Sequence, residues 1–334
     1  MPRVVMIMGL PASGKSSLAR DFEERGYVLL NRDKAGGRVV DLVPKLRAGL
    51  RAGWDMVVDN TFVTLEHRAP FVAAANELGA SVELHWMQTS FEDCTVNACH
   101  RSIDRYGIIP GTPEEIKANP DMAADPNIFP IAVLFAMKRK LEGVKKKGVW
   151  EVPCGKPTMD EGYSRIVKVP FVRRPPTGTR KALILDYDGT LRDDARDHGG
   201  QRPYPTEVSQ VSVLPNVPET LARYADDGYL MLGVTIQSGI ERGHLTAERA
   251  FECILETNRL AGQPDTHTSW CPHYRFPIAC YCRKPQVGLG VMLTREHELN
   301  PAECIMVGDK TTDKTFATRC GFQFAWATDF FGWG

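Results

Sequence analysis

The chain has 334 residues, 43% of them hydrophobic and 25% charged, which is typical of a soluble globular protein and long enough for two domains. Its 41 basic and 41 acidic residues cancel, which excludes a general electrostatic attraction to nucleic acid or membranes, so a site for polyanions has to be a local patch. No apolar run approaches the roughly 20 residues that cross a bilayer. We therefore expect no membrane association and a cytoplasmic location, with the nine cysteines mainly as thiols.

The first half of the chain is predicted to alternate strands with helices. The expected strands span residues 4–8, 27–30, 56–59 and 82–87, and two of the expected helices span residues 17–24 and 66–78. Residues 108–130 carry five prolines and little periodicity. This segment is expected to form a mobile lid, an insertion that contacts the substrate, or a plain surface excursion.

Residues 174–180 form a predicted linker, because this stretch is rich in proline and glycine and lacks apolar periodicity. The second half again alternates strands and helices, with expected strands at residues 182–186, 229–235 and 304–308. Both halves therefore predict an α/β fold with mostly parallel sheets covered by helices, in domains of residues 1–173 and 181–334. In such sheets ligands bind at the carboxyl ends of the strands.

Residues 9–16 read G-L-P-A-S-G-K-S, which matches the phosphate-binding pattern G-x-x-x-x-G-K-[ST] between a predicted strand and a predicted helix. Glycines in such a loop let backbone N–H groups point at phosphates, and the helix N-terminus favours the anion. We expect Lys15 to reach the β- and γ-phosphates of ATP and the Ser16 hydroxyl to bind Mg²⁺. A chance glycine-rich turn is the alternative. The full set expected to contact ATP is Gly9, Ser13, Gly14, Lys15, Ser16, Ser17 and Arg101.

Three further places favour a kinase over a nucleotide hydrolase. Asp33 ends the second strand in an Asn-Arg-Asp run, where it could accept a proton from an attacking hydroxyl. Arg101 and Arg105 are four residues apart and would share one face of a helix, from which they could clamp a phosphoryl group. Each residue alone could equally be a helix cap or a surface charge. The expected acceptor contacts are Asp59 and Asn60, which end the third strand, and Arg38.

The runs at residues 26–33, 57–61 and 157–163 resemble the 5′-hydroxyl kinase domain of polynucleotide kinase–phosphatases, over about the first 173 residues. The resemblance implies that Asp33 is the general base and that Arg105 stabilises the transition state. The chain departs from some members at Gly36, where they carry an arginine that binds a 3′-phosphate, although Arg38 is near. Residues 108–130 are also longer than the resemblance leads us to expect.

Asp186 and Asp188 follow the first strand of the second half in the run Asp-Tyr-Asp-Gly-Thr. Two carboxylates two residues apart at a strand end can face one site, where one attacks phosphorus and the other donates a proton to the leaving oxygen. Thr235 at the end of the next strand and Lys284 before a proline could hold phosphoryl oxygens. The carboxylates available for Mg²⁺ after a later strand are those of Asp309 and Asp313.

This ordered set resembles the haloacid-dehalogenase superfamily over residues 181–334. The resemblance implies a Rossmann-like domain with an aspartyl-phosphate on Asp186, Asp188 as acid and then base, and phosphate contacts from Thr235 and Lys284. Ile236 departs from the asparagine usual at that position. Gaps of about fifty residues on either side of Thr235 leave no clear place for a large cap domain, so an open site is expected. The implied Mg²⁺ ligands are Asp186, Asp188, Asp309 and Asp313.

Cys271, His273, Cys280 and Cys282 lie within twelve residues, and three thiolates with one imidazole are enough for a tetrahedral Zn²⁺ site. The pattern C-x-H…C-x-C-R-K-P is similar to the zinc loop of histidinol-phosphate and heptose-bisphosphate phosphatases. That resemblance implies a structural zinc that shapes the substrate loop next to Lys284. A loop of free cysteines is the alternative.

The two halves together predict a bifunctional enzyme that heals broken nucleic-acid ends. The kinase would move the γ-phosphate of ATP onto a 5′-hydroxyl, and the phosphatase would remove a 3′-phosphate from RNA or DNA, after which a ligase could seal the break. Basic runs at residues 138–140 and 145–147 offer a local phosphate-binding patch or a solvated helix face. One alternative is an enzyme acting on a phosphorylated sugar or similar metabolite, which the zinc pattern and zero net charge favour. A nucleotide sensor without catalysis is the other.

Overall fold

The computed structural model describes residues 1–146, 149–173, 177–274 and 280–333. The chain packs into two compact units: the first is Met1–Ala98 with Pro120–Arg173, and the second is Cys99–Asn119 with Arg174–Gly334. Residues 99–119 therefore pack with the second unit, whereas the sequence assigns them to the first domain. Residues 174–176 of the predicted linker lie outside the described residues. In the described part of the chain, no helix is both long enough and apolar enough to cross a membrane.

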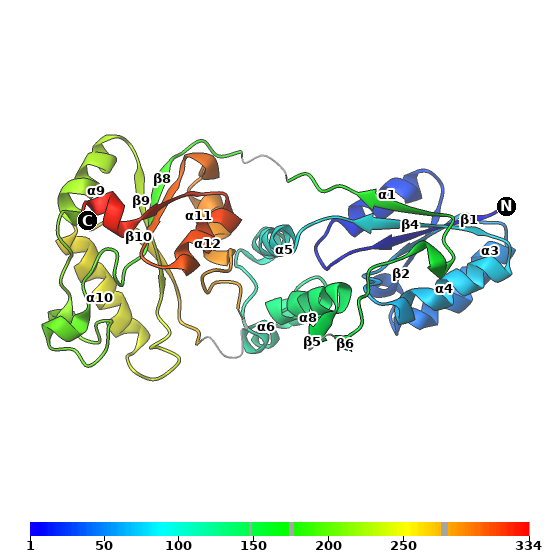
Figure 1. The fold of residues 1–334 in the computed structure, drawn as a ribbon, viewed down its shortest axis with the longest axis horizontal. Coiled ribbons are helices and arrows are strands. Elements are labelled where there is room, and N and C mark those ends of the chain that lie inside the picture. Colours follow the sequence, from blue (N-terminus) through cyan, green and yellow to red (C-terminus); the bar gives the residue numbers. More distant parts are fainter. Residues whose placement is uncertain (147–148, 174–176, 275–279, 334) are drawn as a thin grey trace. The chain divides into compact units, whose positions relative to one another are not determined.

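The first unit is built on a parallel sheet of five strands in the order β2-β3-β1-β4-β7 (Figure 1). The strands are β1 (Arg3–Met8), β2 (Val28–Asn31), β3 (Met56–Asp59), β4 (Ser81–Met87) and β7 (Arg165–Val169). The first four confirm the predicted strands to within one residue at each end. A separate antiparallel pair consists of β5 (Val144–Lys146) and β6 (Val149–Val152).

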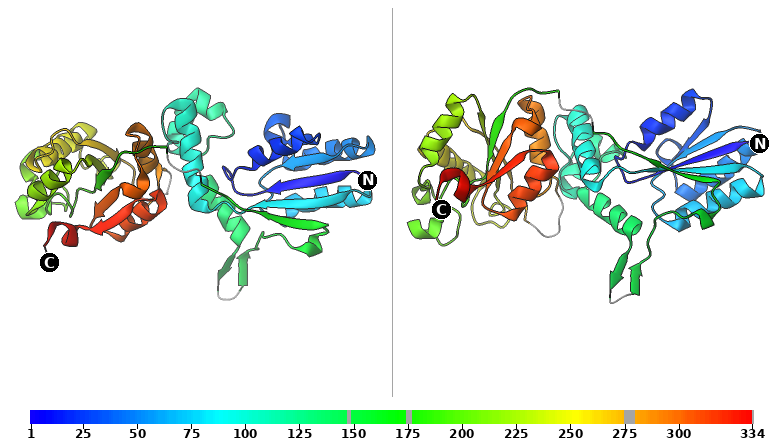
Figure 2. Two further views of the ribbon diagram at one scale, coloured as in Figure 1. Left: turned by 90° about the horizontal axis from the view of Figure 1, so that it is seen from above. Right: turned by 45° about the horizontal axis from the view of Figure 1, so that its top comes forward.

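The alternation of side chains along β1 divides the core of the first unit into two layers. Val4 and Met6 face the layer covered by α3 (Val43–Arg51) and α4 (Leu65–Glu77), whereas Val5 and Ile7 face α1 (Lys15–Glu24). None of these four side chains is more than 3% exposed, so β1 is buried on both faces like other central parallel strands. Figure 2 shows these helices on the two sides of the sheet.

Residues 108–130 contain two short helices, α6 (Pro113–Ala118) and α7 (Pro120–Ala124), between α5 (Phe91–Tyr106) and α8 (Ile131–Glu142). The Thr112 hydroxyl accepts from the Glu115 N–H, and the Glu115 carboxylate accepts from the Thr112 N–H, which is a capping box. Pro113 and Pro120 each stand at the first helical position, where proline is favoured. These two prolines therefore start helices. That residues 108–130 act as a lid or contact the substrate stays a prediction.

The second unit contains another parallel sheet of five strands, in the order β10-β9-β8-β11-β12. The strands are β8 (Ala182–Leu185), β9 (Leu230–Ile236), β10 (His267–Cys271), β11 (Ile305–Gly308) and β12 (Gln323–Trp326). The predicted strands are confirmed as β8, β9 and β11. Because β8 lies between β9 and β11, the segments that follow these three strands meet at one edge of the sheet.

Helices cover both faces of this second sheet (Figure 1). Leu183 and Leu185 pack against α9 (Val217–Asp226) and α10 (Ala247–Leu260), with α13 (Ala327–Phe331) on the same side. Ala182 and Ile184 pack against α11 (Gly288–Glu296) and α12 (Thr311–Cys320). Besides loops and α9, the chain between β8 and β9 forms only the short 3-10 helices η3 (Ala195–His198) and η4 (Val208–Gln210). The gap that the sequence leaves for a cap therefore holds no further domain.

Candidate functional site

The phosphate loop of the first unit has the shape that its sequence predicts. Ala12 and Gly14 have φ values of 61° and 92°, so the backbone turns sharply just before α1. A Cβ atom on Gly9 would lie 2.6 Å from the Ser13 Oγ atom and 2.9 Å from the Met87 Cβ atom, so only glycine fits there. The Ser13 Oγ atom is buried with no hydrogen-bond partner among the described residues. An unsatisfied hydroxyl in a loop of this geometry fits a bound phosphate.

Lys15 and Ser16 begin α1 directly after the loop. The Lys15 Nζ atom donates to the Leu10 carbonyl at 2.8 Å, which folds the side chain back over the loop. The Ser16 hydroxyl donates to the Asp59 Oδ2 atom at 2.9 Å. Ser17 is held by a hydrogen bond from its N–H to the Gly14 carbonyl at 3.1 Å. The hydroxyl predicted to bind Mg²⁺ therefore lies against a buried carboxylate.

Asp59, which the sequence predicts to contact the acceptor, is buried at the end of β3, and the contact with an acceptor stays a prediction. Its side chain is 3% exposed and accepts from both the Ser16 hydroxyl and the Asn31 Nδ2 atom, each at 2.9 Å. The Asn31 Oδ1 atom in turn accepts from the N–H groups of Asp33 and Lys34, so Asn31 caps α2 (Arg32–Ala35). Asn31, which the sequence analysis left without a role, thus links the ends of β2 and β3.

The other predicted acceptor and kinase residues are partly or fully exposed, and they are divided between the two units. Asp33 has a side chain that is 38% exposed and pairs with Arg32 at 2.7 Å. Arg38 is 82% exposed and pairs with Asp41. The Asn60 Oδ1 atom accepts from the Thr61 N–H at 2.7 Å. Arg101 and Arg105 both lie on α5, in the part that packs with the second unit, so their relation to the phosphate loop stays a prediction.

A buried ion pair supports the turn after β3. The Arg68 guanidinium donates to both Glu161 carboxylate oxygens, at 2.7 and 2.6 Å, and to the carbonyls of Phe62 and Gly155. Tyr163 adds a hydroxyl hydrogen bond to Glu161. Burial alone would raise the pKa of the Glu161 carboxyl, but the bonds from Arg68, Tyr163 and the Thr158 N–H outweigh it and lower the pKa. The run at residues 157–163 therefore acts here as a structural support.

Asp186 and Lys284 form the centre of the second unit's site. The Asp186 N–H donates to the Val307 carbonyl at 3.1 Å, which aligns the residue with the end of β11. The Lys284 Nζ atom lies 2.7 Å from the Asp186 Oδ1 atom, 2.7 Å from the Asp313 Oδ1 atom and 3.0 Å from the Val234 carbonyl. Burial opposes the charge of Lys284, but the two carboxylates outweigh burial and raise its pKa. Lys284 is therefore a buried ammonium aimed at the predicted nucleophile.

Three of the four carboxylates predicted to bind Mg²⁺ in the second half come together here, and that of Asp188 is not among them. Carboxylate oxygens of Asp186, Asp309 and Asp313 lie within 4.8 Å of one another, and an all-oxygen set suits Mg²⁺. The Lys310 Nζ atom donates hydrogen bonds to the Asp188 carbonyl oxygen at 3.2 Å and to the Asp309 Oδ1 atom at 3.0 Å. Both oxygens therefore already contact a positively charged group. Burial raises the pKa of both Asp309 and Asp313, which a bound cation would oppose. Lys310 was missed at the sequence level, although it directly follows Asp309.

Asp188 has a buried partner that the sequence analysis did not single out. The Arg192 Nε atom donates to the Asp188 Oδ1 atom at 2.7 Å, and Arg192 is 1% exposed. Its Nη1 atom donates to the Thr257 hydroxyl at 3.3 Å, and its guanidinium lies over the Tyr187 ring. The only signal in the sequence was an arginine four residues after Asp188. Arg192 therefore holds the predicted acid in place.

Thr235 is also oriented by a buried neighbour. Its hydroxyl accepts from the Gln237 Nε2 atom at 3.0 Å, and neither side chain is more than 4% exposed. The Gln237 N–H donates to the Cys271 carbonyl at 2.7 Å. Ile236 stands where the resemblance leads us to expect asparagine, and the amide that contacts Thr235 belongs to Gln237, the next residue. This contact ties the end of β9 to the cysteine cluster.

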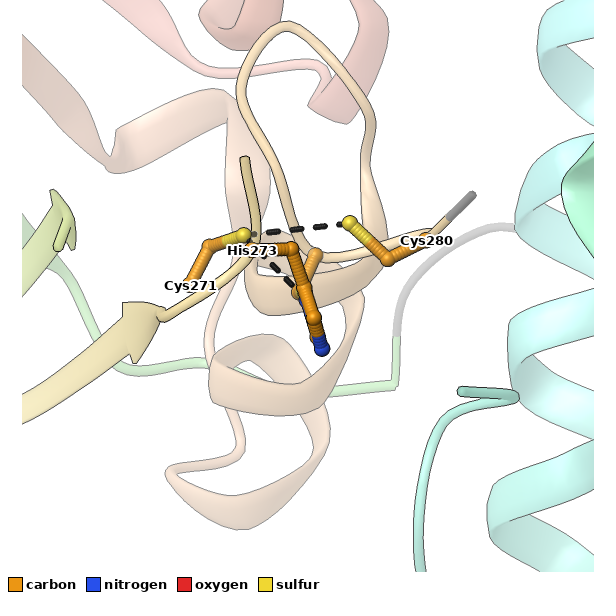
Figure 3. Close-up of side chains that lie close together, drawn as sticks. Cys271, His273 and Cys280 are labelled. Atoms are coloured by element: carbon orange, nitrogen blue, oxygen red, sulfur yellow. Dashed lines mark hydrogen bonds between the residues drawn. The ribbon is translucent and has the colours of Figure 1, made fainter. Parts of the chain in front are cut away.

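The four predicted zinc ligands meet at one point of the second unit. Figure 3 shows the Cys271 and Cys280 sulfur atoms facing each other, with the His273 ring beside them. The Cys271 Sγ atom lies 3.8 Å from the Cys280 Sγ atom and 3.5 Å from the His273 Nδ1 atom, which is 3.2 Å from the Cys282 Sγ atom. All four ligand atoms lie within 4.8 Å of one another. Three sulfurs and one imidazole nitrogen at these separations fit a tetrahedral Zn²⁺ ion.

Comparison with known proteins relates each half of the chain to a family. The AAA domain family matches residues 4–106, and a HAD-hydrolase-like family matches residues 281–329. The D-glycero-beta-D-manno-heptose-1,7-bisphosphate 7-phosphatase of Haemophilus ducreyi is 33% identical over 154 residues, which cover 43% of this chain and 80% of that protein. Through its second unit, the chain belongs to the heptose-bisphosphate phosphatase family.

Other heptose-bisphosphate phosphatases show the same extent of similarity. The 7-phosphatase of Haemophilus influenzae is 30% identical over 141 residues, which cover 40% of this chain and 73% of that protein. A crystal structure of D,D-heptose 1,7-bisphosphate phosphatase from B. bronchiseptica, complexed with magnesium and phosphate, is 24% identical and covers 44% of this chain and 79% of that one, with a TM-score of 0.38. The family matches and the two curated relatives show a P-loop kinase-like half and a HAD-type phosphatase half, and the substrate of each half stays a prediction.

Proposed function

We propose that this heptose-bisphosphate phosphatase homologue is a bifunctional enzyme of phosphorylated sugars. The second unit removes a phosphate from a sugar bisphosphate, and the first unit transfers the γ-phosphate of ATP to a hydroxyl of a sugar or sugar phosphate. The observation that carries the proposal is the buried Lys284 ammonium 2.7 Å from the Asp186 carboxylate, next to the three carboxylates of a cation site. An ionised nucleophile, a phosphate-binding cation and a metal site are the parts that phosphoryl transfer to a carboxylate requires.

In the first step of hydrolysis, an Asp186 oxygen attacks phosphorus and the bond from phosphorus to the sugar oxygen breaks. Asp188 donates its proton to that sugar oxygen, so the leaving group departs as a neutral hydroxyl. Arg192 keeps the Asp188 carboxyl directed by its 2.7 Å hydrogen bond. Lys284 and the Thr235 hydroxyl bind the phosphoryl oxygens, where charge gathers in the transition state.

In the second step, water attacks the phosphorus of the aspartyl-phosphate and the bond to the Asp186 oxygen breaks. Asp188, now a carboxylate, takes a proton from that water. The oxygen of the water becomes part of the inorganic phosphate that leaves. A Mg²⁺ ion held by Asp186, Asp309 and the Asp188 carbonyl, with Asp313 beside them, would supply charge neutralisation for the phosphoryl oxygens. The Asp186 carboxylate and the protonated form of Asp188 are then restored.

In the first unit, the loop from Gly9 to Ser16 binds the ATP phosphates. Asp33 accepts the proton of the acceptor hydroxyl, whose oxygen bonds to the γ-phosphorus as the bond to the β-phosphate oxygen breaks and ADP leaves. Asp59 orients the Ser16 hydroxyl, since the two lie 2.9 Å apart. Asp33 is partly exposed in α2, just after the end of β2, where an acceptor can reach it.

Nucleic-acid end healing is the rival proposal, and the kinase motifs at residues 26–33 and 57–61 support it. Three observations favour the sugar instead: the relatives are named for a heptose bisphosphate, the chain has zero net charge, and the Cys-His cluster follows the zinc-loop pattern. An end-healing enzyme contacts several backbone phosphates and benefits from a basic surface. The zero net charge provides no such general attraction.

The experiment that tests the proposal compares two substrate classes on the full chain. Phosphate release is measured from heptose 1,7-bisphosphate, from other sugar bisphosphates and from a 3′-phosphate oligonucleotide, with Asp186→Asn as the inactive control. Transfer of labelled phosphate from ATP is measured to the dephosphorylated sugar and to a 5′-hydroxyl oligonucleotide, with Lys15→Ala as the control. We expect the sugar to be preferred by at least about 100-fold in kcat/KM, the range of a few well-placed polar contacts. Preference for either oligonucleotide would establish the rival.

A further inference from the structure

A third group of side chains able to bind a metal lies apart from the aspartates of the phosphatase site and from the cysteine cluster. His267 begins β10, Glu296 ends α11, and His297 is the residue that caps α11. One ligand atom from each of the three lies within 4.8 Å of the others. The two imidazole rings are 5.0 Å apart in an edge-to-face arrangement, and the His267 Nε2 atom lies 3.7 Å from the Glu296 Oε2 atom.

The backbone holds these side chains on rigid elements. The His297 N–H donates to the Leu293 carbonyl at 3.0 Å, which closes the last turn of α11. The next two residues are also fixed, because the Glu298 carbonyl accepts from the Arg180 N–H at 3.1 Å and the Leu299 side chain is fully buried. His267 is paired in register with β9. Ligands on fixed backbone lose little freedom when they bind a metal.

The polar atoms of His267, Glu296 and His297 lie close together, but no hydrogen bond is formed between His267 and Glu296 and none is formed by the His297 Nε2 atom among the described residues. The His297 Nε2 atom is buried and has no hydrogen-bond partner among the described residues. The 3.7 Å between His267 and Glu296 is too long for a hydrogen bond. A buried, unpartnered ring nitrogen requires an explanation, and an ion is one of the accepted explanations. A metal ion bound among these three side chains would give the His297 ring a polar partner.

We propose that His267, Glu296 and His297 form a third metal site, for a divalent first-row transition cation such as Zn²⁺. Two imidazoles and a carboxylate suit such ions and leave a coordination position for water. Bond lengths of about 2.0–2.1 Å place tetrahedral ligand atoms about 3.3 Å apart, so modest side-chain rotations close the site. The side chains of His267 and Glu296 are 49% and 44% exposed, so both have solvent on one side into which they can rotate.

The location gives the site a structural role. Strand β10 is at the edge of the sheet, and its other end carries Cys271 of the cysteine cluster, about 13 Å away along the strand. Helix α11 follows the segment that carries Lys284. A metal at His267 would therefore fasten the free end of the edge strand to the end of α11, while the cysteine cluster fastens the opposite end of the strand.

Metal counting on the full chain tests the proposal. The protein is stripped of metal and titrated with Co²⁺ in excess Mg²⁺, which occupies the oxygen-only sites. We expect two equivalents, one with the sulfur charge-transfer absorption of the cysteine cluster and one without it. Variants His267→Ala, His297→Ala and Glu296→Gln are expected to lose the second equivalent, with affinity lowered by more than about 100-fold, and to keep the first. The added metal should raise Tm in the Cys280→Ser, Cys282→Ser variant as well.

The matched control is His198→Ala, because His198 is a partly exposed histidine paired with Asp193 outside the group. The His198→Ala variant should bind two equivalents of Co²⁺, like the unaltered chain. Glu296→Gln changes only an exposed side chain, so a folding defect cannot account for its loss of metal. Binding of one equivalent by the unaltered chain overturns the proposal, and so does a second equivalent that persists in all three variants.

Discussion

The Lys284 Nζ atom lies 2.7 Å from the Asp186 Oδ1 atom and 2.7 Å from the Asp313 Oδ1 atom, and all three side chains are buried. The single ammonium therefore neutralises two carboxylates that face the same space. Replacing it with methionine would leave both buried carboxylates without this ammonium. For Lys284→Met we expect a loss of about 3–5 kcal/mol in the free energy of unfolding and at least about a 100-fold fall in phosphatase kcat. Urea unfolding and phosphate release measure the two effects, and an unchanged kcat would contradict the role in phosphate binding.

The two active sites are expected to fail independently, because each set of motifs is complete within its own half. Lys15→Ala should lower ATP-dependent transfer by about 100- to 1,000-fold and leave phosphate release unchanged. Asp186→Asn should have the opposite effect. Both reactions are measured on the same preparations. If Lys15→Ala removed phosphatase activity from a folded protein, the two sites could not be independent.

Loss of the cysteine cluster should affect one activity only. Cys280→Ser with Cys282→Ser removes two of four ligands, so elemental analysis of protein purified without chelator should show one zinc fewer than the unaltered chain. The loop that carries Lys284 directly follows Cys282, so phosphatase activity should fall at least about tenfold while phosphate transfer from ATP persists. Cys154→Ser, at an exposed thiol outside the cluster, is the matched control. Unchanged zinc content in the double variant would remove the cluster as a metal site.

Arg192 is expected to position Asp188 for proton transfer. Arg192→Met breaks the 2.7 Å hydrogen bond to the Asp188 carboxylate, so kcat should fall about 10- to 100-fold with little change in KM. Arg192→Lys keeps a donor and should recover part of the loss. Arg196→Met removes a similar pair, between Arg196 and Asp194 on the surface, and should leave kcat unchanged. A change in KM alone would show that Arg192 serves substrate binding instead.

The buried pair of Arg68 and Glu161 should make the first unit's stability depend on pH. The folded pKa of Glu161 lies below its ordinary value of 4.5, so the pair contributes stability above pH 4.5 that is lost as the pH falls through the folded pKa. At neutral pH, Glu161→Gln should lower the free energy of unfolding by about 3 kcal/mol. The difference between the two proteins should shrink below pH 4.5. Glu77→Gln, at the more exposed pair with Arg47, is the control and should lower the free energy of unfolding much less, because solvent screens that pair.

Much of this protein could be read from local sequence. The phosphate loop is a contiguous run, so its glycines and Lys15 are recognisable without knowledge of the rest of the chain. Buried parallel strands are short apolar runs, which is why β1, β3 and β8 were predicted to within one residue. The four cysteine-cluster ligands are also local, because they lie within twelve residues. The family of the second unit follows from the same kind of ordered motif.

The pairing of side chains from distant segments was decided only by the tertiary structure. Strand order in both sheets departs from chain order, so Asp59 meets Ser16, 43 residues earlier, and Lys284 meets Asp186, 98 residues earlier. His267 and His297 approach each other because the start of an edge strand lies beside the end of a helix. A hydrogen bond or ion pair forms over about 3 Å, and a periodic pattern fixes which face a residue occupies but not its neighbour across the sheet. Strand order and helix packing supply that neighbour, which is why these contacts emerge only when the chain is folded.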